Sequence, residues 1–177
     1  MKKALVITII VIMYFFIYFL HVNFFSWFTI AGVMPNLFVL LILFTGLFIN
    51  SKVGSIVGFA LGLYTDFLFG NKIGINAILF LIVGFSGGFL DKKFSKDSRM
   101  TLLIVSTSVT AIYELLFYSY NNMVFSASTN ISAFLFTLLI ELLYNALLII
   151  IFYPLIHKYG CRAENAFENK DVLLRYF

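Results

Sequence analysis

The 177-residue chain is poor in charge, cysteine, proline and tryptophan. Only 11% of its residues are charged, against about 25% in soluble domains, whereas 62% are hydrophobic. Too few polar residues remain to cover a soluble fold of this size, which excludes a soluble enzyme, and the hydrophobicity excludes a disordered chain. A single cysteine, Cys161, excludes an internal disulfide framework and a cysteine-based zinc site. The remaining class is a polytopic membrane protein.

Six apolar runs are candidate transmembrane helices, because about 20 residues rising about 1.5 Å each cross the hydrocarbon core. They cover residues 4–22, 29–49, 53–70, 73–90, 100–120 and 132–157. We predict an all-α protein with one six-helix transmembrane domain over residues 1–157 and a short cytoplasmic tail over 158–177. The runs 53–70 and 73–90 are short, so four spans with this pair re-entrant is an alternative. The tail is either a short interfacial helix or solvated.

The basic residues predict the orientation. If Lys2 and Lys3 are cytoplasmic and six spans alternate, eleven of the twelve lysines and arginines fall inside, and only Lys72 falls outside. The inverted arrangement would break the positive-inside rule. We therefore predict that both termini are cytoplasmic, in contact with anionic lipids. The net charge of +4 does not indicate nucleic-acid binding, because no basic-aromatic motif is present.

Acidic residues inside apolar runs are the next informative feature. Asp66, Glu114 and Glu141 would each cost about 2.5–3.5 kcal/mol at the centre of a lipid-facing helix, so we expect them to face protein or water. With the predicted topology, an intramembrane polar cluster gathers in the outer half of the membrane. Its members are Asn36, Asp66, Asn76, Glu114, Glu141 and Asn145. The cluster is either a pocket open to the outside or a hydrogen-bond network that fixes the bundle.

Glycines at a spacing of four lead along one helix face to the first of these acids. Gly54, Gly58 and Gly62 precede Asp66, and such rows let helix backbones approach closely in lipid. They form either an intramolecular packing face or an interface with a partner. His21 and His157 fall at opposite membrane faces, where we expect interface residues and not ligands. No zinc-protease, serine-hydrolase or nucleotide-binding motif is present, so we predict no enzyme, cofactor or metal.

The segment from Gly58 to Ala77 resembles a family. Its glycines, its acid and the following Asn-Ala reproduce the G-x3-G-x3-D-x3-G-x3-G-x-x-A pattern of the rod shape-determining protein MreD family. The matching positions are Pro35, Gly58, Gly62, Asp66, Gly70, Gly74 and Asn76. The chain length and the acid in each of the last two runs are also similar to that family. The resemblance implies that these residues serve helix packing or complex assembly, not catalysis.

The resemblance further implies a non-enzymatic scaffold of the cell-elongation complex in the bacterial inner membrane, supporting lateral peptidoglycan synthesis. The implied partners are a bitopic MreC-type protein, an MreB-type actin-like filament, a SEDS polymerase and a class B penicillin-binding protein. The family's fold is similar to the substrate-binding subunits of energy-coupling-factor transporters. This similarity supplies the alternative, a transporter subunit that captures a small vitamin or metal.

Overall fold

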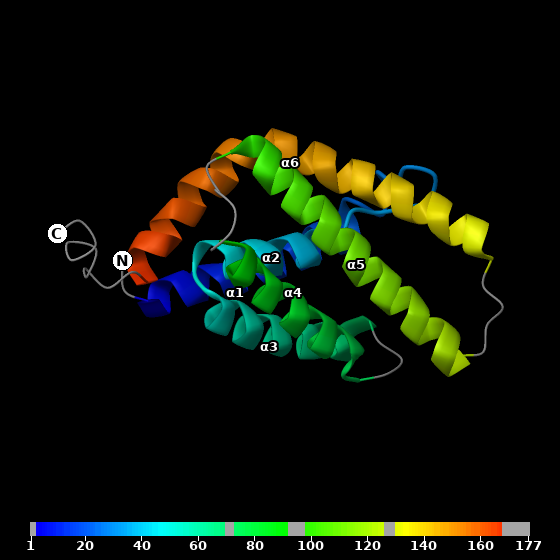
Figure 1. Cartoon of the computed structure of the whole chain (residues 1–177), viewed down its shortest axis with the longest axis horizontal. Coiled ribbons are helices and arrows are strands. Elements are labelled where there is room, and N and C mark those ends of the chain that lie inside the picture. Colours follow the sequence, from blue (N-terminus) through cyan, green and yellow to red (C-terminus); the bar gives the residue numbers. More distant parts are fainter. Residues whose placement is uncertain (1–2, 70–72, 92–97, 126–129, 168–177) are drawn as a thin grey trace.

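The computed structural model describes residues 3–69, 73–91, 98–125 and 130–167, and its regular structure there is helical apart from an isolated bridge between Ile30 and Val33. The helices, shown in Figure 1, are α1 (Lys3–Asn23), α2 (Leu37–Phe48), α3 (Ser51–Phe69), α4 (Ile75–Asp91), α5 (Arg99–Phe125) and α6 (Ile131–Phe167). By length and composition α1, α3, α5 and α6 can cross a membrane, whereas α2 and α4 are shorter apolar helices.

The second helix begins later than the apolar run predicts. The apolar run starts near residue 29, but α2 begins at Leu37 and has 12 residues. Two successive residues before it, Ala31 and Gly32, have positive φ angles of 51° and 80°, which a helix does not allow. Pro35 disfavours helix in the residue before it, and the Asn36 side chain then caps α2 by accepting from the Val39 N–H at 3.3 Å. Hydropathy alone could not locate this start.

Glycines bring α2, α3 and α4 into close contact. A Cβ atom on Gly62 of α3 would lie 2.5 Å from the Asn76 carbonyl oxygen of α4, and one on Gly54 would lie 2.6 Å from the Gly84 carbonyl oxygen. Gly58 likewise faces the Phe80 backbone. The row of small residues is therefore occupied by helices of the same chain. With no apolar driving force between helices in lipid, this close backbone approach holds the three-helix centre together.

The sixth helix extends beyond its predicted span. It runs for 37 residues to Phe167, with Pro154 in its interior, and Figure 1 shows it changing direction in this part of the chain. A proline removes a helical hydrogen bond and crowds the preceding turn, which accounts for the bend. After the bend, Ala163 and Phe167 pack against the core. Residues 158–167 of the expected tail are thus helical, and the rest of it lies outside the described residues.

Contacts between distant segments define one end of the bundle. The start of α1 meets the end of α6, where the Lys3 ammonium lies 5.8 Å from the Phe167 ring centroid. The end of α2 and the start of α5 meet the region of α6 around its bend. The contacts join Lys3 to Phe167, Phe48 to Gly160, Ser51 to Gly88 and Arg99 to Tyr153. This end, rich in basic residues, is called the basic end below.

A polar layer and cavity as the candidate functional site

The polar residues of the interior lie at a common depth. α3 begins at the basic end with Ser51, and Asp66 lies 15 residues further along it. α5 begins there with Arg99, and Glu114 also lies 15 residues further along. At about 1.5 Å per residue, both lie about 22 Å from that end. Asn76 is 15 residues before Asp91, where α4 returns to the basic end. Helix length therefore places side chains from several helices in one layer.

Asp66 caps the start of α4 from a neighbouring helix. Its carboxylate accepts hydrogen bonds from the backbone N–H groups of Gly74 at 2.8 Å, Asn76 at 3.1 Å and Ala77 at 3.2 Å. The Asn76 side-chain amide donates a fourth bond at 2.8 Å. Asp66 is 0% exposed. A negative charge against the free N–H groups of a helix start satisfies them and complements the helix dipole.

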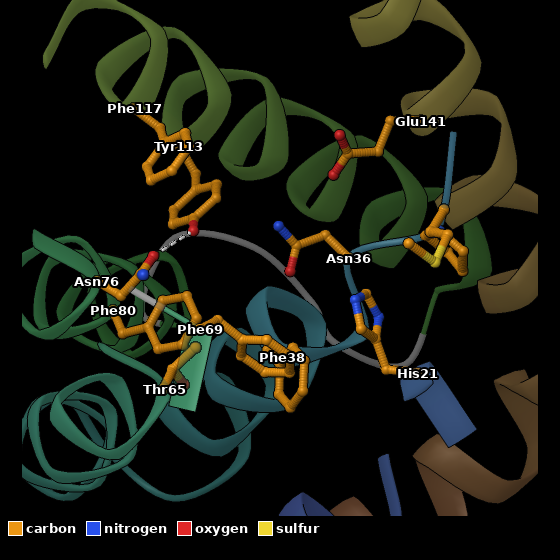
Figure 2. A pocket seen from close by; sticks show the side chains of 12 residues that line it. His21, Asn36, Phe38, Thr65, Phe69, Asn76, Phe80, Tyr113, Phe117 and Glu141 are labelled. Atoms are coloured by element: carbon orange, nitrogen blue, oxygen red, sulfur yellow. Dashed lines mark hydrogen bonds between the residues drawn. The ribbon is translucent and has the colours of Figure 1, made fainter. Parts of the chain in front are cut away.

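Asn76 links this cap to α5. Its side-chain oxygen accepts a hydrogen bond from the Tyr113 hydroxyl at 2.8 Å, drawn as a dashed line in Figure 2. Next to Asp66 in α3, the hydroxyl oxygen of Thr65 lies 2.7 Å from that of Tyr14 in α1, and the two share a hydrogen bond. Side chains beside Asp66 therefore tie α1, α3, α4 and α5 together.

Asn36 is the second centre of the layer. Besides capping α2, its backbone N–H donates to Asn145 Oδ1 of α6 at 3.0 Å, and its side-chain amide donates to Glu114 Oε1 of α5 at 3.3 Å. Glu141 of α6 interacts with both Asn36 and Glu114. The start of α2 is thereby fixed to the α5–α6 pair by polar contacts.

A cavity of about 240 Å³ lies beside this layer. Its lining combines polar groups with aromatic rings, as Figure 2 shows: His21, Asn36 and Glu141 lie on one side, and Phe80, Tyr113 and Phe117 on the other. The lining also includes Met34, Pro35, Phe38, Thr65, Phe69 and Asn76. The polar cluster and the cavity are therefore parts of one site at the end of the bundle away from the basic end.

The structure places most of the site residues that were predicted from the sequence. Those of the polar cluster are brought together around Asp66 and Asn36, and Pro35 lines the cavity. Gly54, Gly58 and Gly62 lie along the helix contacts that lead to the layer. Gly74 has φ +112°, a conformation that favours glycine, and presents its N–H to Asp66. Gly70 is outside the described residues.

Several residues of the site were not found by sequence reasoning. His21 was expected at a membrane interface, but its ring faces the cavity (Figure 2). Its position at the outer end of the first span was the available signal, because it matched the depth of the polar cluster. Tyr14, Thr65 and Tyr113 gave no signal, since isolated tyrosines and threonines are common in apolar helices. Their roles depend on how the helices are rotated.

The fold and this site define an α-helical membrane protein whose buried polar groups hold helix ends in place. Within the described ranges, no group of three or more His, Cys, Asp or Glu side chains is placed to hold a metal ion.

Comparison with known families places the chain among proteins of cell morphogenesis. The family model described as rod shape-determining protein MreD matches residues 1–162, so the chain belongs to the MreD family. This confirms the family predicted from the Gly58–Ala77 segment, and with it a membrane protein of rod-shape determination. No curated protein and no solved structure matches the chain. The family match gives no support to the transporter alternative.

Proposed function

We propose that the protein is a non-enzymatic scaffold of the bacterial cell-elongation complex, spanning the cytoplasmic membrane several times and supporting lateral peptidoglycan synthesis. The state of Asp66 is the observation that carries the proposal. This central acid of the family motif is fully buried and accepts four hydrogen bonds from the start of α4. Its carboxylate is occupied by hydrogen bonds that fix the start of α4, which suits a structural role. A catalytic acid would have to reach a substrate.

The proposed orientation has both termini in the cytoplasm and the polar layer in the outer half of the membrane. It is supported by the way Lys3, Lys52, Arg99 and Lys158 all lie at or next to the basic end, in helices that meet there. The polar layer lies at the opposite side of the same bundle, about 22 Å away. An excess of positive charge on one side is the pattern that orients membrane proteins.

The proposed partners are those of the elongation machinery: an MreC-type bitopic protein, an MreB-type filament, a SEDS polymerase and a class B penicillin-binding protein. The exposed faces of the helices suit lipids and transmembrane partners. On α1, for example, Ile12 is 61% exposed, Phe16 54% and Phe19 59%. Apolar side chains that the chain does not bury itself need lipid or another helix around them.

The test is depletion of the protein in its native host, combined with co-purification. Depletion is expected to round the cells, and the tagged wild-type chain in mild detergent is expected to retain the MreC-type partner. Asp66→Ala should reduce that retention, because it releases the start of α4. Ala60→Leu, an exposed position on α3, is the matched control and should retain the partner. Unchanged rod shape after depletion would contradict the scaffold function.

A further inference from the structure

Buried polar atoms without a partner remain beside the cavity. Glu141 is 7% exposed, yet its Oε1 atom has no hydrogen-bond partner, and neither has the buried Nδ1 atom of His21. Both residues line the cavity. An unsatisfied buried acceptor is costly, above all inside a membrane. The cavity also far exceeds the roughly 10–15 Å³ that one water needs, so these atoms face space large enough for a ligand.

The charge around these atoms favours a cation. Glu114 and Glu141 are neighbouring carboxyl groups, and among the described residues no lysine or arginine lines the cavity. Asp66 adds a third acid to the same layer, although its charge faces the start of α4. A bound cation would stabilise the charged form of these two adjacent carboxyl groups, whereas an anion would destabilise it.

Aromatic rings form much of the remaining lining of the cavity. They come from four helices, so a ligand there would contact several elements of the bundle at once. They belong to Phe38, Phe69, Phe80, Tyr113 and Phe117. Faces of aromatic rings attract ammonium groups and also bury apolar atoms. The volume of about 240 Å³ is just below the range of about 300–1,000 Å³ for most ligand pockets, which indicates a small ligand.

We infer that this cavity is a binding site for an organic primary ammonium group attached to a small apolar body. Such a group has three N–H donors, and the polar side of the cavity offers acceptors for them: Glu141 Oε1, His21 Nδ1 in the neutral ring, and the Asn36 side-chain oxygen. The apolar body would contact the aromatic rings. The group is supplied either by a free amine or by the ethanolamine headgroup of a membrane lipid.

Phenethylamine and its neutral analogue 2-phenylethanol are the matched probes. With the full-length protein in maltoside detergent, calorimetric titration is expected to show saturable binding of phenethylamine, and the amine should raise the unfolding temperature. 2-Phenylethanol has a similar shape without the positive charge, and it should bind at least about tenfold more weakly, since hydrogen bonds to charged groups are the stronger ones. Equal binding of both probes, or binding of neither, would overturn the site.

Glu141→Gln tests the residue that carries the inference, because it keeps the shape of the side chain and removes its charge. It should weaken phenethylamine binding about tenfold or more. Glu164→Gln, on α6 beyond Pro154 and away from the cavity, is the control with the same chemistry and should bind like the wild type. If Glu141→Gln does not fold, His21→Phe replaces it. A folded variant of either kind with wild-type affinity would contradict the proposal.

The source of the ammonium group is distinguished in lipid nanodiscs. If the protein is more stable in phosphatidylethanolamine than in phosphatidylglycerol, and Glu141→Gln loses this difference, the ligand is a lipid headgroup. If the protein is equally stable in both lipids, the ligand is a free amine. The site does not depend on the scaffold function. A chain that supports rod shape but binds no amine would overturn the site alone, and a chain that binds the amine but leaves cell shape unaffected would overturn the scaffold alone.

Discussion

At the residue scale, the protein is organised by two polar side chains that cap helices. Asn36 caps its own helix, α2, whereas Asp66 caps α4 from the end of α3. Gly74 stands just before α4 with φ +112° and has no side chain to act as a cap. The acid of the neighbouring helix therefore supplies the acceptors that the first N–H groups of α4 need.

Removal of the Asp66 carboxylate is expected to destabilise the bundle. Asp66→Ala leaves three backbone N–H groups and the Asn76 amide without their acceptor. Since each buried donor left unsatisfied costs about 1–3 kcal/mol, we expect the free energy of unfolding to fall by about 3 kcal/mol or more. Asp66→Asn keeps one acceptor oxygen and should lose less.

Thermal unfolding in detergent, followed by circular dichroism, measures this effect. Glu164→Gln is the control, since it removes an acid outside the polar layer. An Asp66→Ala variant that unfolds at the wild-type temperature would show that the start of α4 does not depend on this carboxylate.

At the element scale, α4 is the centre of the structure because it contacts α2 and α3 through glycines. Gly84 faces Gly54 of α3, and Gly87 faces the backbone of Leu43 in α2. The longer α5 and α6 are attached to this centre by polar contacts, from Tyr113 to Asn76 and from Asn145 to Asn36, and also by apolar packing against the core. Glycine contacts thus hold α2, α3 and α4 together, whereas polar contacts and apolar side chains attach α5 and α6.

A bulky side chain on the glycine row should separate α3 from α4. Gly62→Leu places a side chain where even a Cβ atom would come within 2.5 Å of the Asn76 carbonyl oxygen. We expect a loss of about 1–3 kcal/mol in unfolding free energy, the usual cost of overpacking. The loss should be accompanied by weaker amine binding, because Asn76 also lines the cavity.

Ala60→Leu on the same helix is the matched control, since Ala60 is exposed and the new side chain would enter lipid or detergent. Both variants are compared by unfolding temperature and by phenethylamine titration. Equal stability of Gly62→Leu and Ala60→Leu would contradict the close α3–α4 contact.

At the scale of the whole molecule, the two sides of the bundle differ in chemistry. The basic end joins the start of α1, the turn between α2 and α3, the start of α5 and the last turns of α6. The opposite side holds the polar layer and the cavity. Beyond this layer α5 continues for 11 residues after Glu114, about 16 Å. The long pair α5–α6 therefore extends past the cavity.

Reporter fusions test the orientation that follows from this asymmetry. A reporter fused after Phe177 is expected in the cytoplasm, because the side of a membrane protein that is rich in basic residues stays in the cytoplasm. A reporter inserted at Ser126, between α5 and α6, is expected outside. Alkaline phosphatase activity and green fluorescence give opposite signals for the two sides. Reversal of either result would place the polar layer in the inner half of the membrane.

Much of this arrangement was predictable from the sequence. The apolar runs indicated six helices, and the Gly58–Ala77 pattern indicated the MreD family. Both patterns are local in the sequence, so they do not depend on how the helices are rotated. Counting residues along each run also predicted that Asp66, Glu114 and Asn76 lie in the same half of the bundle. The start of α2 was missed because hydropathy does not register the positive φ angles at Ala31 and Gly32. The path of α6 beyond Pro154 was missed because it depends on Phe48 and other distant contacts.

The sequence by itself determined the class of protein, its helical character and how far along its helix each polar residue lies, because hydrophobicity and a fixed rise per residue are properties of the chain. Only the tertiary structure decided what the polar residues do. Helix rotation and packing brought Asp66 onto the start of α4, Asn36 between α5 and α6, and His21 into the cavity. A hydrogen bond needs a partner within about 3 Å, and that partner lies on another helix.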